Sequence, residues 1–205
     1  MPNANLIELE TSLHDCVKYC ETHSDSELGR LYYKRLARTK HQLESSIATS
    51  DDYHVKWRTE EREHVIAWKQ LAQVLNETKR RLRSINAKGF RPGQVLYWDR
   101  EILTDEVNAM VEYLKEHQDA FDFSSNTIER IDRLLDTTVS EGGEELRARK
   151  DFQRFVDIRR EAISEAGSMI GEFRVAMRRV LGKTHPDYQS IFWPYAIASD
   201  EGVLF

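Results

Sequence analysis

The sequence has little cysteine, proline or glycine, and each shortage narrows the possible folds. Its 205 residues include two cysteines, four prolines and nine glycines. So few turn-forming residues argue against a turn-rich β fold and against a disordered chain. Cys16 and Cys20 lie four residues apart in a helical pattern, and a continuous helix does not readily bring such a pair into disulfide geometry. We expect both thiols to be reduced, as in a cytoplasmic protein.

Long apolar runs and an excess of positive charge are also missing. No apolar stretch approaches the roughly 18 residues that a membrane-spanning helix needs. The first five residues lack a basic region followed by an apolar segment, so we expect no secretory signal here. The formal net charge of -5 gives no general attraction to nucleic acid or to an anionic membrane. These absences favour a cytoplasmic protein without a membrane partner.

What the sequence does contain is helical periodicity. Apolar residues recur every three or four positions along nearly the whole chain, which is the period of an amphipathic helix. The pattern predicts an all-α fold, an elongated antiparallel helical bundle with long, coiled-coil-like helices. The strictest seam runs from Trp57 to Ile85, with spacings that alternate between four and three. We expect one helical bundle domain over residues 1–183.

Several short segments predict where the helices end. Ser50-Asp51-Asp52 offers a helix cap, and residues 88–93 contain two glycines and a proline. Gly142-Gly143 predicts an interruption. Gly182 occupies a favoured position after a helix, and Pro186 is expected to prevent the helix from resuming. The predicted helices cover about 4–21, 27–48, a third segment that ends near 87, a fourth that begins near 99 or 104 and ends near 118, a short segment from 125, and 144–181.

The end of the chain differs in composition from the rest. Residues 188–205 contain five aromatic side chains. Pro194 and the lack of a helical period predict an extended segment over residues 184–205, which docks on its own bundle, on another subunit or on a partner. Aromatic side chains combine a large apolar area with a polar handle, which suits interfaces. The predicted partner-binding residues are Tyr188, Phe192, Trp193, Tyr195 and Phe205.

One motif suggests a metal. Glu61 and His64 have the Glu-x-x-His spacing, which places both side chains on one helix face, as ferritin-like metal-binding bundles require. Both fall on the apolar seam, and His117 falls on the seam of the next helix. Charged groups that face a core need partners or a metal. A complete di-iron site needs a second such motif, which the sequence lacks. The other interpretation is structural: Glu61 pairs with Arg159 or lies near a splayed helix end, the histidines are hydrogen-bonded, and no cofactor is bound.

A basic cluster suggests a second possibility. Arg80, Arg81, Arg83 and Arg91 lie at the end of one predicted helix and in the loop after it, where they could contact phosphate or nucleic acid. The simpler interpretation is that cations near a helix C-terminus complement the helix dipole. Aromatic residues do not alternate with these arginines as they do in proteins that bind single strands.

No motif for a common enzyme class is present. The sequence lacks a phosphate-binding Gly-rich loop, a nucleophile elbow and a metalloprotease helix motif. It therefore predicts a non-enzymatic structural or interaction protein, with no small-molecule substrate, that forms a homo-oligomer or binds a protein partner through its aromatic tail. A ferritin-like metal-binding bundle is the alternative, and a bundle that contacts nucleic acid is a weaker one.

Overall fold

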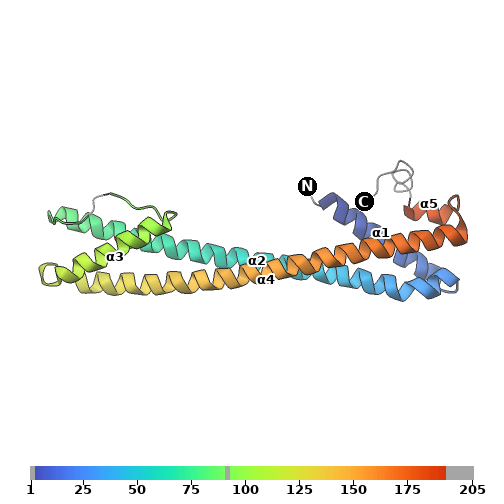
Figure 1. The fold of residues 1–205 in the computed structure, drawn as a ribbon, viewed down its shortest axis with the longest axis horizontal. Coiled ribbons are helices and arrows are strands. Elements are labelled where there is room, and N and C mark those ends of the chain that lie inside the picture. The colour runs from blue at the N-terminus through green and yellow to red at the C-terminus, as the bar shows by residue number, and fades with distance from the viewer. Residues whose placement is uncertain (1–2, 91–92, 193–205) are drawn as a thin grey trace. The chain divides into compact units, whose positions relative to one another are not determined.

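The structure is a computed structural model that describes residues 3–90 and 93–192, with side chains from Leu6 onward. These residues form five α-helices and a 3-10 turn, and no β-strand occurs among them. The predicted all-α class is therefore confirmed. None of the described helices has a stretch long and apolar enough to cross a membrane. The elements are α1 (Asn3–Thr22), α2 (Glu27–Ser84), α3 (Arg100–Glu116), η1 (Gln118–Ala120), α4 (Ser124–Leu181) and α5 (Pro186–Phe192) (Figure 1).

The chain divides into two compact units, and each has its own apolar core. Unit 1 consists of residues 1–52 and 153–205, and unit 2 consists of residues 53–152. Both α2 and α4 contribute to each unit. Within unit 2 these helices are antiparallel, because His64 of α2 pairs with Glu145 of α4, whereas the later residue Glu77 pairs with the earlier residue Arg130.

The core of unit 1 is built around Phe173 of α4. Its ring lies 5.3 Å from that of Tyr32 on α2 and 6.5 Å from that of Phe192 on α5. Cys16 and Cys20 of α1 are buried in the same cluster and form no disulfide. Burial raises the pKa of the Cys20 thiol to about 11, so this thiol is protonated at neutral pH.

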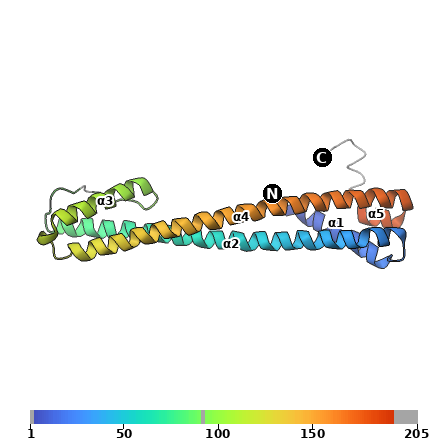
Figure 2. The same ribbon diagram turned by 60° about the horizontal axis from the view of Figure 1, so that its bottom comes forward.

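The core of unit 2 forms where α3 packs beside α2 and α4 (Figure 2). The heptad seam of α2 supplies leucines to this core, as the periodicity predicts. Lys79, with 2% of its surface exposed, points its ammonium group at Glu106 of α3, at an N–O distance of 2.7 Å. The fully buried leucines and isoleucine here are Leu71, Leu75, Leu82, Leu103, Leu114 and Ile131.

Two predicted helix breaks are wrong. α2 continues through Ser50-Asp51-Asp52, and α4 continues through Gly142-Gly143. None of the three polar residues of the first segment caps a helix, because α2 runs through all of them; Ser50 is buried, and the Asp51 carboxylate pairs with Arg159 of α4 at 3.3 Å. A helical glycine costs only about 1 kcal/mol relative to alanine, which tertiary packing readily offsets.

Three other predicted boundaries are confirmed. α2 ends at Ser84, and α3 begins only at Arg100, so the described part of the predicted break, residues 88–90 and 93, lies between these helices. Asp99 caps α3 by accepting a hydrogen bond from the Ile102 amide. α4 ends at Leu181, and Gly182 follows with a φ of 88°, a left-handed conformation that favours glycine.

The predicted extended segment starts with a helix instead. Residues 186–192 form α5, which contacts α1 within unit 1. Pro186 is the first residue of this helix, where its missing N–H costs nothing and its fixed φ is favourable. α4 does not resume after Gly182, as expected, but the proline starts a new short helix where an extended segment was predicted. The predicted division of the chain after residue 183 stays a prediction.

Candidate functional site

The three predicted metal ligands each have other partners within unit 2. The Glu61 carboxylate pairs with Arg58 one turn earlier, at 2.6 Å. The His117 ring stacks on Tyr113, and its Nδ1 lies 2.9 Å from the Tyr113 carbonyl oxygen. Among the described residues, Glu61, His64 and His117 do not gather into a group of converging ligand atoms.

His64 uses both of its ring nitrogens. Its Nδ1 lies 2.5 Å from an oxygen of Glu145, and its Nε2 lies 2.8 Å from the indole nitrogen of Trp68. An indole N–H can only donate, so Nε2 is the acceptor and carries no proton. Nδ1–H then donates to the Glu145 carboxylate. Both nitrogens of the buried ring are therefore engaged, and neither is left to bind a metal.

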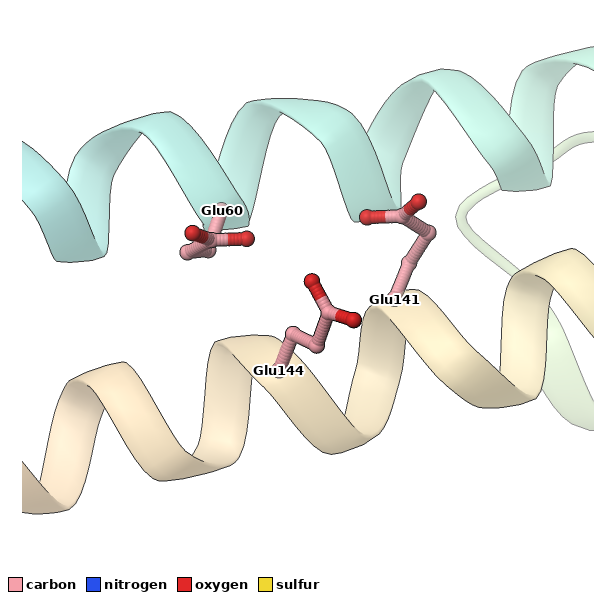
Figure 3. A group of neighbouring side chains, drawn as sticks. All are labelled: Glu60, Glu141 and Glu144. Carbon is pink, nitrogen blue, oxygen red and sulfur yellow. The ribbon is translucent and has the colours of Figure 1, made fainter.

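A different set of acidic side chains comes together beside His64. Figure 3 shows Glu60 on α2 facing Glu141 and Glu144, which extend from α4. One oxygen from each of the three carboxylates lies within 4.8 Å of the others. Partial burial raises the pKa of Glu141, and the neighbouring carboxylates, led by Glu144, raise it further. One oxygen of Glu141 is also buried without a hydrogen-bond partner.

This acidic cluster has the chemistry of a weak hard-cation site at most. Carboxylate oxygens suit calcium, magnesium or manganese. A ferritin-like centre also uses two histidines, and His64 is already engaged by Trp68 and Glu145. The donor set therefore does not fit a di-metal centre. Its clearest physical effect is repulsion between like charges on two paired helices.

Sequence reasoning missed Glu141 and Glu144 because it placed a helix break between them. With α4 continuous through Gly142-Gly143, their three-residue spacing puts both carboxylates on one face. That spacing is visible in the sequence, but the facing residue Glu60 is not. It becomes a neighbour only through the register of α2 against α4.

The structure keeps part of the predicted basic cluster together and adds a third arginine from another helix. Arg80 and Arg81 of α2 line a cavity of about 490 Å³ together with Arg130 of α4. Arg80 and Arg83 also line a second, smaller cavity of about 290 Å³. The fourth predicted residue, Arg91, lies outside the described residues.

Two of the five predicted partner-binding aromatics lie in the core of their own unit. Tyr188 and Phe192 are 3% and 1% exposed, and both pack in the cluster around Phe173. In this arrangement neither ring is accessible to a partner. The other three, Trp193, Tyr195 and Phe205, lie outside the described residues.

An exposed apolar segment that the sequence analysis did not select precedes and enters α3. Trp98 is 65% exposed, Leu96 is 41% exposed and Ile102 is 50% exposed. Trp98 lies in a turn closed by a hydrogen bond from the Asp99 amide to the Leu96 carbonyl oxygen. Tyr97 packs edge-on against Trp98, with ring centres 5.1 Å apart. The turn thus presents a large indole to solvent.

Comparison with known proteins adds no assignment. No protein-family model, no curated protein and no solved structure matches this chain.

Proposed function

We propose that this chain is a non-enzymatic interaction protein, which binds a protein partner or a second copy of itself through exposed apolar side chains on its helical units. The observation that carries the proposal is the exposure of Trp98, 65%, between the exposed residues Leu96 and Ile102. Leaving large apolar side chains in water is unfavourable, and tryptophan is the residue type most enriched at the energetic centres of interfaces.

The surroundings of Trp98 fit an interface with a polar rim. The Lys69 ammonium lies over the Tyr97 ring at 5.0 Å, and the Arg100 guanidinium lies over the Trp68 ring at 5.5 Å. Cations held over aromatic rings around an apolar centre give a contact surface with an apolar middle and a charged, polar rim.

The predicted role of the C-terminal aromatics remains part of the proposal in a reduced form. Because Tyr188 and Phe192 are buried within unit 1, the candidates for partner contacts at that end are Trp193, Tyr195 and Phe205. These three are a second contact region, which the proposal does not require.

Site-directed photo-crosslinking of the full chain tests the proposal. A photoreactive amino acid is placed at position 98 and, as a matched control, at position 139. Val139 is an apolar residue that is 76% exposed on α4. We expect position 98 to give one discrete product, either with a second copy or with one other protein. Equal products from both positions, or none from position 98, would overturn the proposal.

A binding measurement completes the test. Trp98→Ala should weaken the captured interaction by about 30-fold or more, as expected for the anchor of an interface. Val139→Ala should leave it unchanged, and circular dichroism should show equal helix content for both variants. Sedimentation velocity then separates self-association from binding of another protein.

A further inference from the structure

We propose that the cavity between the end of α2 and the start of α4 in unit 2 binds one phosphate-type oxyanion, either free phosphate or the phosphate group of a small molecule. Its lining contains three arginines and one glutamate, so the cavity is positively charged. The lining residues are Val74, Glu77, Thr78, Arg80, Arg81, Asn126, Thr127 and Arg130.

Two of the three arginines already have partners within unit 2. The Arg81 guanidinium lies over the Phe123 ring at 5.4 Å. Arg130 lies 3.5 Å from a carboxylate oxygen of Glu77, which also accepts a hydrogen bond from Gln73 at its other oxygen. Planar guanidinium groups match the geometry of phosphate oxygens, and fixing them in advance lowers the entropy cost of binding.

The first turn of α4 adds hydrogen-bond donors at the same place. Ser124 donates its amide to the Phe121 carbonyl oxygen and Thr127 to that of Phe123, but no backbone acceptor is found for the amides of Ser125 and Asn126. A helix start with open amides beside arginines favours an anion.

Helix-dipole complementarity does not explain the whole cluster. It accounts for Arg80 and Arg81 near the C-terminus of α2, where positive charge is stabilising. It does not account for Arg130, which lies in the second turn of α4, closer to the helix end that favours negative charge, and which pairs with Glu77. An anion between the two helix ends would be stabilised by both sets of groups.

The cavity favours a small molecule over a nucleic acid. Its volume of about 490 Å³ is in the range of small-molecule sites. No aromatic ring lines it, so it offers no platform on which successive bases would stack. This inference is independent of the proposed protein–protein function, and it adds a ligand where the sequence predicted no small-molecule substrate.

Isothermal titration calorimetry of the full chain tests the site, with inorganic phosphate, pyrophosphate and adenosine 5′-monophosphate as probes. Sodium chloride at equal ionic strength controls for screening. We expect one binding event per chain, and the double variant Arg81→Gln, Arg130→Gln should weaken it by at least about tenfold. Binding of inorganic phosphate alone would identify free phosphate, whereas tighter binding of the nucleotide would identify a phosphate ester.

A matched double variant, Arg62→Gln with Arg149→Gln, serves as the control. These arginines are exposed on the same two helices, and neither lines the cavity. The net charge changes equally in both double variants, so a general charge effect would weaken binding in both. That result, or no binding of any of the three probes, would overturn the proposal. Circular dichroism checks that both variants keep their helix content.

Discussion

Within unit 2, α2 and α4 pair along two stretches with opposite chemistry. Beneath α3 the seam of α2 is made of Leu71, Leu75 and Leu82, all fully buried. Nearer to residue 57 the same seam carries Glu61 and His64, in the stretch where the acidic cluster also lies. The first stretch is stabilised by removal of apolar surface from water. The second depends on a few specific polar contacts.

The acidic stretch is nevertheless ordered by particular contacts. His64 connects Trp68 to Glu145, and the Trp57 ring stacks on Phe152 with ring centres 5.5 Å apart. Such contacts fix the register of the two helices, but the buried apolar side chains of this stretch, Ala67 and Ala148, are small. The comparison indicates that one end of unit 2 supplies stability, whereas the other is sensitive to charge and to small changes in shape.

The largest expected effect is in the leucine stretch. Leu75→Ala removes a fully buried side chain, so the free energy of unfolding should fall by about 2–5 kcal/mol. Urea unfolding followed by circular dichroism measures the change. Val55→Ala, at a residue that is 66% exposed on the same helix, is the control and should have little effect. Similar losses for the two variants would contradict the assignment of stability to this core.

The two glycines of α4 give a smaller effect that depends on position. A Cβ at Gly143 would meet nothing within 4 Å, so Gly143→Ala should stabilise the protein by roughly 0.5–1 kcal/mol. A Cβ at Gly142 would lie 3.1 Å from the Nε2 atom of His64. Because Trp68 and Glu145 hold that ring, Gly142→Ala should give no gain or a loss. Equal stabilisation by both, in thermal unfolding, would show that His64 is not held as described.

The smallest effect concerns charge in the acidic cluster. Since the folded-state pKa of Glu141 is raised, the folded protein binds more protons, and its stability should rise as pH falls through that pKa. Glu141→Gln removes the repulsion, so it should raise the melting temperature slightly at pH 7 and flatten its dependence on pH. Glu112→Gln, at an exposed residue of α3, is the control. A lower melting temperature for Glu141→Gln at pH 7 would contradict the repulsion.

Much of the fold could be predicted from local patterns. The all-α class, the leucine seam and the end of α4 at Gly182 depend on short-range periodicity and on turn chemistry. The predicted breaks at Ser50-Asp51-Asp52 and Gly142-Gly143 were wrong because packing against a partner helix outweighs weak local preferences. The extended conformation predicted for residues 184–205 was wrong at its start, because Pro186 is compatible with the first turn of a helix.

The candidate sites were harder to predict from the sequence than the fold. Arg80 and Arg81 could be selected because they are neighbours in the chain. Arg130 joins their cavity from a different helix, about 50 positions later, and no local signal connects it to them. Glu60 likewise meets Glu141 only across the helix pair.

The sequence by itself determined that this chain forms amphipathic helices, because helical periodicity is a property of neighbouring residues and of backbone geometry. Only the tertiary structure decided which side chains face each other. His64 and Glu145 are 81 positions apart, and their contact depends on the register in which two helices pack. That register results from many weak contacts along both helices, and no short segment contains it.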